Sequence, residues 1–392
     1  MVHPAVYLDH AATTPVRPEV RDAMLPFLGG ELFGNPSSSH RFGRAVRAAV
    51  EGARRELAEA VGVAPNEVIF TSGGTEADNL AVLGACLEAR EQGHPMIAAV
   101  GTTEHKAILA AAHEVVHLGG REILLPVDDD GRLRLDALEL ALAERPAIVS
   151  VMWANNETGV LHPVAEIGAR CRTAGVRFHT DLVQAFGKVP VDLAEVRVDL
   201  ATVSAHKIGG PKGIGALIVR NRTRLAPRQH GGGQQAGVRP GTENVAGIVG
   251  LGRAALLAAR DRAAETVRLA ALRDELEARL LASVTDLHVT GQGAPRAPHI
   301  LSVQAAGADG ESLLHQLDLA GIAASGGSAC ATGNVEPSHV LTAMGIPRER
   351  ALGAVRFSLG RETTRSDIER VTAIFGQAVE KSRRLAAALG RA

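Results

Sequence analysis

Short apolar runs alternate with longer helical patterns between residues 68 and 219. The strand-like runs are 68–71, 97–100, 122–125, 148–152, 176–179, 200–204 and 216–219, and helical patterns between the earlier ones cover 76–89, 106–116, 136–142 and 164–174. Continuous apolar strands separated by helices are typical of a mainly parallel sheet with both faces covered. This part of the chain therefore predicts an α/β fold.

The pattern changes after Gly241. An Ala/Leu/Arg-rich stretch to about residue 281 predicts one or two helices. A strand-like 300–303, a helix at 312–319, a Gly-rich 324–333, a strand-like 355–359 and a last helix from residue 366 follow. Domains usually hold roughly 100 to 200 residues, so we expect two units. They are a large domain of residues 15–260 and a smaller α/β domain of residues 1–14 and 261–392.

Composition narrows the class of protein. Of the 392 residues, 46% are apolar and 22% charged, with a net charge of −1, which is typical of a globular protein without a nucleic-acid or membrane-surface partner. The first 30 residues lack a basic stretch followed by an apolar run, so we expect no signal peptide, and no run reaches the roughly 20 apolar residues that span a membrane. Cys86, Cys171 and Cys330 are too few for a disulfide framework, so we expect a reducing, cytoplasmic location.

A glycine-rich turn follows the first of these strands. Residues 71–76, Thr-Ser-Gly-Gly-Thr-Glu, end the strand and open a helix. Glycines let backbone N–H groups approach an anion, and a helix N-terminus favours negative charge, so the turn is a candidate phosphate site. An ordinary tight turn with a Ser or Thr N-cap explains the same residues about equally well.

Two reactive side chains follow later strands. Asp181 ends one strand and Lys207 follows the next, at the sheet edge where ligands of open α/β folds bind. Taken alone, Asp181 is more simply explained as a helix N-cap. Pyridoxal phosphate, however, needs a lysine amine, an acid beside its ring nitrogen and a phosphate site, and all three candidates occur in order. Lys106, at a polar helix start, and Lys212, in a Gly/Pro turn, are the alternative lysines.

Two other motifs have chemical potential. Cys330 lies in a glycine-rich segment, whereas Cys86 lies in an apolar one; a free thiol, with a pKa of about 8.5, needs activation to be a nucleophile at neutral pH. Composition alone leaves the role of Cys330 open and favours packing roles for Cys86 and Cys171. His113 and His117 match the H-E-x-x-H zinc signature, but glycines 119 and 120 end that helix and no convincing third ligand follows.

The chain resembles the class V, fold-type I pyridoxal-phosphate enzymes, and specifically the group I cysteine desulfurases of the IscS/NifS type. The matching segments are 7–15, 34–38, 71–79, 103–106, 155–159, 204–215, 230–242, 328–330 and 356–361. The resemblance implies a homodimer in which the large domain binds pyridoxal 5'-phosphate and the small domain carries the loop with the catalytic Cys330.

The resemblance also implies roles for individual side chains. Lys207 would carry the cofactor as a Schiff base, His105 would stack on its ring and assist proton transfer, and Cys330 would accept the sulfur. Asp181 would pair with the ring nitrogen. The other implied contacts are Asn156 and Gln184 at the ring side, Gly74, Thr75, Ser204 and His206 at the phosphate, Thr242 at the phosphate of the neighbouring subunit, and Asn35, Asn156 and Arg356 at the substrate carboxylate.

The implied reaction converts L-cysteine to L-alanine and leaves the sulfur on Cys330 as a persulfide. An acceptor or scaffold protein would then take the sulfur for iron–sulfur cluster, thio-cofactor or tRNA biosynthesis. No resident metal is expected, although Cys330 could transiently ligate a cluster iron. The alternatives are a selenocysteine lyase or other class V enzyme, a zinc hydrolase built on His113 and His117, and a non-catalytic sulfur-delivery protein. His10 and the residues after Cys330 depart from the family pattern, which bears on acceptor preference.

Overall fold

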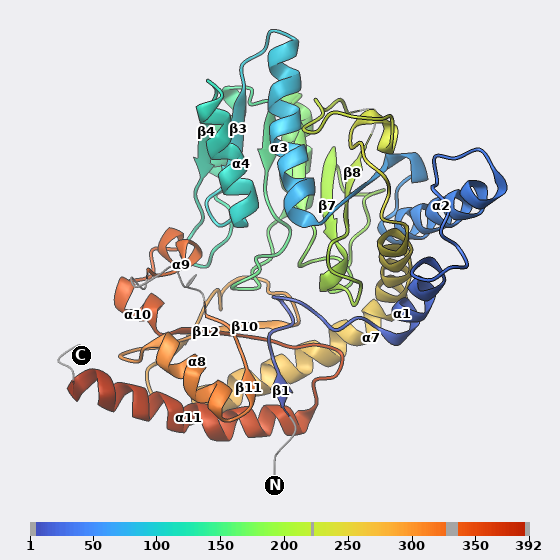
Figure 1. The fold of residues 1–392 in the computed structure, drawn as a ribbon. Coiled ribbons are helices and arrows are strands. Elements are labelled where there is room, and N and C mark those ends of the chain that lie inside the picture. The colour runs from blue at the N-terminus through green and yellow to red at the C-terminus, as the bar shows by residue number, and fades with distance from the viewer. Residues whose placement is uncertain (1–4, 221–222, 327–335, 389–392) are drawn as a thin grey trace.

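A seven-stranded sheet forms the centre of the larger part of the molecule (Figure 1). The computed structural model describes residues 5–220, 223–326 and 336–388. In the order β2-β8-β7-β6-β5-β3-β4, strand β8 is antiparallel to both neighbours and the other pairs are parallel. The strands are β2 (Val68–Thr71), β3 (Ile97–Gly101), β4 (Arg121–Leu125), β5 (Ile148–Ser150), β6 (Phe178–Asp181), β7 (Leu200–Ser204) and β8 (Gly215–Val219). The predicted, mainly parallel sheet is confirmed.

Helices cover both faces of this sheet. On one face lie α3 (Gly74–Glu91) and α4 (Lys106–His117), which share a buried core with the sheet. On the other lie α1 (Pro18–Met24), α2 (Arg41–Val61), α5 (Leu135–Ala143), α6 (Val164–Ala174) and the first half of α7 (Val245–Ser283). Short 3-10 turns are Leu25–Phe27, Pro65–Glu67, Ala205–Lys207 and Gln235–Gly237. The two-sided cover explains why these strands are apolar throughout.

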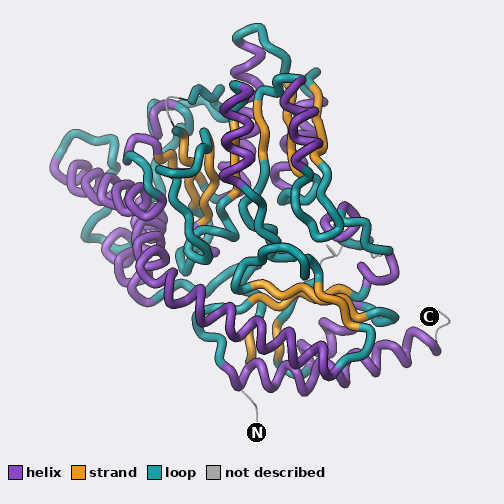
Figure 2. Tube along the Cα trace, turned by 180° about the vertical axis from the view of Figure 1, so that it is seen from behind, coloured by secondary structure: helices purple, strands orange, loops and turns teal. Residues whose placement is uncertain are grey.

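The helix α7 joins this sheet to a second core. It is one continuous helix of 39 residues, about 58 Å long at the usual helical rise. The sequence predicted one or two helices here, and the structure has one. Its second half packs with a small antiparallel sheet and with α11, as Figure 2 shows from behind. The remaining elements are β1 (Val6–Tyr7), β9 (Leu287–Val289), β10 (Ile300–Ala305), α8 (Gly310–Leu319), β11 (Ile322–Ala323), α9 (His339–Ala343), α10 (Arg348–Leu352), β12 (Ala354–Ser358) and α11 (Arg365–Ala388).

The N-terminal strand belongs with this second core. β1 pairs in parallel with β11, and Val6 and Leu8 are buried among the residues of the smaller sheet. The chain therefore passes the smaller core before it enters the larger sheet. The domain boundaries predicted at residues 14/15 and 260/261 stay a prediction.

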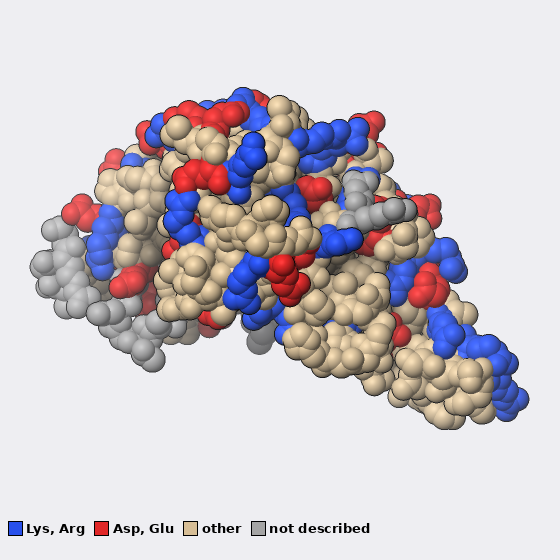
Figure 3. Space-filling view, turned by 90° about the horizontal axis from the view of Figure 1, so that it is seen from above, with Lys and Arg blue, Asp and Glu red and all other residues tan. Residues whose placement is uncertain are grey.

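The surface carries mixed charge. On the face shown in Figure 3, lysine and arginine side chains are interspersed with aspartate and glutamate, in keeping with the net charge of −1. Within the described parts of the chain, none of the helices has the length and apolar character needed to cross a membrane.

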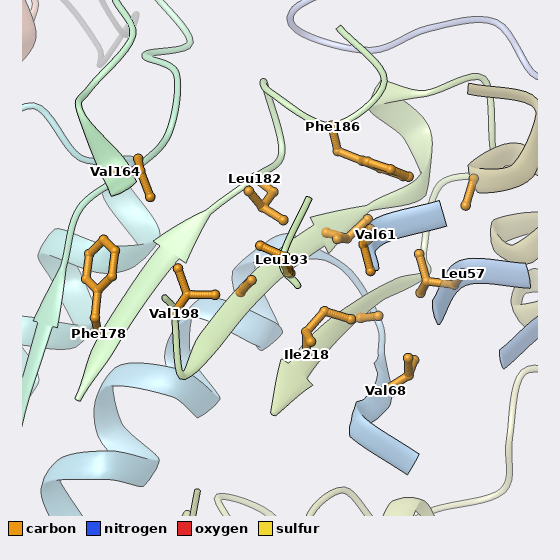
Figure 4. Packing of buried hydrophobic residues seen from close by; sticks show 14 of the residues in the cluster. Leu57, Val61, Val68, Val164, Phe178, Leu182, Phe186, Leu193, Val198 and Ile218 are labelled. Carbon is orange, nitrogen blue, oxygen red and sulfur yellow. The ribbon is translucent and has the colours of Figure 1, made fainter. Parts of the chain in front are cut away.

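Core packing beneath the larger sheet gives a stability prediction. Leu57 is fully buried in the cluster of Figure 4, where Val61 and Ile218 also lie. We expect Leu57→Ala to lower the free energy of unfolding by about 2–5 kcal/mol, because the removed side chain leaves a cavity. Urea denaturation measures this loss, and Leu140→Ala, at a position 74% exposed, is the matched control. Equal stability of the two variants would contradict the packing.

Candidate active site

A cavity of about 320 Å³ opens at the carboxyl ends of β6 and β7, next to the start of α3. This is the edge of a parallel sheet at which ligands bind in open α/β folds. The cavity brings together ten of the predicted site residues: Gly74, Thr75, His105, Asn156, Asp181, Gln184, Ser204, His206, Lys207 and Arg356. Its other lining residues are Ala11, Ala12, Asp78, Met152, Ala154 and Val183.

Lys207 lies in the 3-10 turn after β7 and is the lysine of this cavity. Its Nζ donates hydrogen bonds to the carbonyl oxygens of Ala11, at 2.6 Å, and Ala12, at 2.7 Å. Burial lowers the pKa of Lys207 to about 8, and the nearby Arg356 acts in the same direction. A useful fraction of this amine is therefore neutral, and nucleophilic, near neutral pH.

Asp181 ends β6 and is buried beside the same cavity. Its Oδ1 accepts a hydrogen bond of 2.7 Å from the backbone N–H of Val183. Burial raises the pKa of Asp181 to about 6, while that hydrogen bond and the positive charge of Lys207 oppose the rise. The carboxyl group is thus mostly ionised at neutral pH and can hold a protonated ring nitrogen.

The N-terminus of α3 forms another side of the cavity. Gly74 begins this 18-residue helix, and Thr75 follows it, so the free backbone N–H groups of the first turn lie beside the cavity. Ser204 and His206 face it from β7 and the turn after β7. Together these groups form a donor set suited to a phosphate.

His105 and His206 are both neutral at physiological pH. Burial and nearby positive charge, chiefly from Lys207, lower the pKa of each, for His206 to about 4. Nδ1 of His105 caps α4 by accepting a hydrogen bond of 3.2 Å from the N–H of Ala107. A neutral imidazole with Nδ1 as acceptor carries its hydrogen on Nε2.

Arg356 enters the cavity from β12 of the smaller sheet. Its guanidinium donates to the carbonyl oxygen of Asn156 at 2.7 Å and to Oδ1 of Asp9 at 2.8 Å. Its buried Nε has no partner among the described residues. An incoming carboxylate would therefore compete with Asp9 for this cation.

The other predicted site residues do not line this cavity. Asn35 lies in a loop, where its side-chain oxygen accepts from the N–H of Ser37. Thr242 borders a separate hollow with His230 and Pro240. Cys330 lies outside the described residues.

Two acidic residues, one lining the cavity and one behind it, were not among the predicted site residues. Asp78 is buried, and its Oδ1 lacks a hydrogen-bond partner within the described chain. Behind the cavity, the buried Glu104 accepts from the N–H of Met152 at 2.7 Å. Burial, with repulsion from Asp181, raises the pKa of both carboxyls well above the usual range. The position of Asp78 could have been predicted from the sequence, because it lies one helical turn after Gly74 and so on the same side of the helix.

His113 and His117, the zinc alternative, lie on α4 with their ring centroids 4.8 Å apart. His113 is 3.5 Å from Glu122 and largely exposed. No three histidine, cysteine or acidic side chains gather as metal ligands in the ranges 5–220, 223–326 and 336–388.

The residues around the cavity fit pyridoxal phosphate. Lys207 offers an amine for its aldehyde, Asp181 a carboxylate for its ring nitrogen, and the start of α3 offers donors for its phosphate. The match to this cofactor is specific, because each of its polar groups has a partner of matching chemistry in the cavity.

The chain is similar in sequence and in structure to known proteins. The family model described as "Aminotransferase class-V" matches residues 6–371. A protein of Dictyoglomus turgidum named "Cysteine desulfurase IscS" is 44% identical over 378 residues, which cover 96% of this chain and 95% of the relative. A solved "NIFS-LIKE PROTEIN" superposes with a TM-score of 0.87 at 32% identity, covering 98% and 99% of the two chains. A structure described as "SspA in complex with cysteine" has a TM-score of 0.78 at 30% identity, covering 90% and 98%.

Proposed function

This chain belongs to the aminotransferase class-V family, as one of its cysteine desulfurases, and from that premise we propose that it converts L-cysteine to L-alanine with Cys330 as sulfur acceptor. The observation that carries the proposal is the cavity in which Lys207, Asp181 and the start of α3 lie together. The naming of full-length relatives as cysteine desulfurases supports the choice of substrate.

Different residues of the cavity bind the cofactor, bind the substrate and transfer protons. When bound, pyridoxal phosphate supplies an electron sink for the substrate's α-carbon. Asp181 keeps the ring nitrogen protonated, and the start of α3 holds the phosphate. Lys207, with a pKa of about 8, takes the α-proton and returns a proton to the product, and His105 assists with its Nε2–H. Arg356 orients the substrate carboxylate by a two-pronged contact, for which it must release Asp9.

The sulfur step needs a thiolate. Burial raises the pKa of Cys86 and Cys171 each to about 12, so both stay protonated at neutral pH. This leaves Cys330 as the nucleophile. Its thiolate attacks the sulfur of the bound cysteine, so that an S–S bond forms and the C–S bond breaks. The electron pair of the C–S bond stays with the β-carbon of the substrate, which takes up a proton to become the methyl group of alanine. Alanine then leaves, and Cys330 keeps the sulfur as a persulfide.

We also propose the partners and the location. A homodimer would place Thr242 of one subunit at the phosphate of the other, which suits its position away from the cavity of its own chain. A sulfur acceptor, such as an iron–sulfur scaffold protein, would remove the persulfide. Cys86 and Cys171 are free thiols, which suits the reducing cytoplasm.

The test of this function is Cys330→Ala. We expect the variant to bind pyridoxal phosphate as the wild type does but to release no alanine from cysteine, because no thiolate can take the sulfur. Alanine is measured by chromatography, and the persulfide by mass spectrometry of the wild-type protein. Cys171→Ala, which removes a buried thiol, should keep full turnover. Alanine release by Cys330→Ala at the wild-type rate would refute the role of Cys330.

A second comparison separates the closest alternative. Turnover of the wild type on L-selenocysteine and on L-cysteine is measured under the same conditions. If the protein is a desulfurase, the wild type releases alanine from cysteine and Cys330→Ala does not. A lyase acting on selenocysteine alone would leave cysteine unchanged.

A further inference from the structure

His299 is a buried histidine behind the cavity, and none of the roles described above involves it. It directly precedes β10 and is 1% exposed. Its Nε2 lies 3.3 Å from Oε1 of Gln184, a residue that lines the cavity. A buried imidazole in contact with a cavity residue can fix how that residue presents its own polar atoms.

The hydrogen-bond partners determine the orientation of the Gln184 amide. Its Nε2 lies 2.9 Å from the carbonyl oxygen of Ala11, which can only accept, so the amide NH2 must lie on that side. The same oxygen accepts from Nζ of Lys207. Oε1 of Gln184 therefore faces His299, and because a carbonyl oxygen accepts, Nε2 of His299 must carry the hydrogen.

The surroundings of His299 agree with this tautomer. Its Nδ1 is buried without a partner among the described residues. Burial lowers the pKa of His299 well below its ordinary value, and the positive charges of Lys188, Arg356 and Arg273 act in the same direction. The ring is therefore neutral and has one hydrogen, on Nε2.

We propose that His299 is a positioning residue, which holds the Gln184 amide so that its second N–H points at the cofactor. An amide NH2 has two hydrogens, and Ala11 uses one of them. The other is left for an oxygen acceptor on the bound cofactor. Without His299, Oε1 of Gln184 loses its donor and Ala11 alone holds the amide, so the direction of the second N–H is no longer fixed. The inference rests on the proposed function for the identity of the cofactor.

The experiment compares pyridoxal-phosphate affinity among three proteins. In His299→Leu we expect the dissociation constant to rise about fivefold to a hundredfold, because a buried acceptor loses its partner. His299→Gln, whose amide can donate from about the position of Nε2, should stay within about threefold of the wild type. The pH dependence of the holoenzyme's visible absorption should shift in His299→Leu and return in His299→Gln.

The matched control is His162→Leu. His162 is also buried, and its Nδ1 accepts from the N–H of Leu133, away from the cavity. This variant should lose stability but keep the wild-type cofactor affinity. Unchanged affinity in His299→Leu, an equal loss in His162→Leu, or failure of His299→Gln to restore binding would each overturn the proposal.

A measurement on the wild type keeps the proposal testable if His299→Leu does not fold. Nitrogen-15 spectra of the histidine rings report which ring nitrogen carries the hydrogen. We expect Nε2–H for His299, and Nδ1–H would contradict the argument. Alanine release by the wild type is assayed separately, so that failure of the desulfurase function is distinguished from failure of the His299 contact.

Discussion

Lys207→Ala is expected to lower turnover on cysteine by at least about a thousandfold, because one side chain both attaches the cofactor and moves protons. The structure gives a reason for this concentration of roles. The amine lies in the cavity with a pKa of about 8, whereas an ordinary lysine titrates near 10.4. Steady-state alanine release measures the loss. Borohydride treatment followed by mass spectrometry should find no covalently attached cofactor in the variant.

Lys212→Ala is the matched control for this prediction. Lys212 is five positions further along, is exposed and does not line the cavity. Its removal should leave covalent attachment intact and change turnover by less than about tenfold. Attachment of the cofactor in Lys207→Ala, or its loss in Lys212→Ala, would move the assignment to another lysine.

Much of the fold was predictable from local sequence. Apolar runs such as 68–71 and 200–204 are buried on both faces, so their composition alone marks them as strands. The start of α3 was predictable from its glycines. The reversal of β8 was not, because the direction of a strand depends on the path of the connection from β7, residues 205–214, and not on the strand's own residues.

The candidate site was predictable where chemistry and position coincide. Lys207 and Asp181 follow adjacent strands, so the topology of a parallel sheet brings them to one edge. The pairing of Arg356 with Asp9 and the contact of His299 with Gln184 were not predictable. Each joins residues more than a hundred positions apart in the chain, and a single sequence carries no local signal for such a contact.

The buried acids explain why one carboxylate can serve the cofactor. Asp78, Glu104 and Asp181 are all buried near one another, and burial raises the pKa of each. Among the three, only for Asp181 does the positive charge of Lys207 oppose the rise in pKa. Ionisation is therefore more favourable at Asp181 than at Asp78 or Glu104, since like charges at close range oppose one another.

Asp181→Asn is expected to lower turnover by about a hundredfold to a thousandfold, because the amide cannot balance a protonated ring nitrogen. The pH dependence is a sharper measurement. In the wild type, cofactor affinity should fall as the pH drops through about 6, where Asp181 takes up a proton. In Asp181→Asn, affinity should be weaker at neutral pH and lack this acidic transition. A transition near pH 6 that persists in the variant would assign it to another group.

The same substitution should stabilise the protein without its cofactor. Asp181 has a folded-state pKa of about 6, above the roughly 3.9 of an unfolded chain. The folded state therefore binds the proton more tightly, and its stability falls as the pH rises from about 4 to 6. At pH 7 the ionised, buried carboxylate of Asp181 therefore lowers the free energy of unfolding of the wild type by up to about 3 kcal/mol. The neutral asparagine does not cause this loss. Urea denaturation of both cofactor-free proteins at pH 7 should find the variant more stable, with a difference that disappears near pH 4. A less stable variant at pH 7 would show that the charge on Asp181 is well solvated or paired, and that burial of this carboxylate carries no cost.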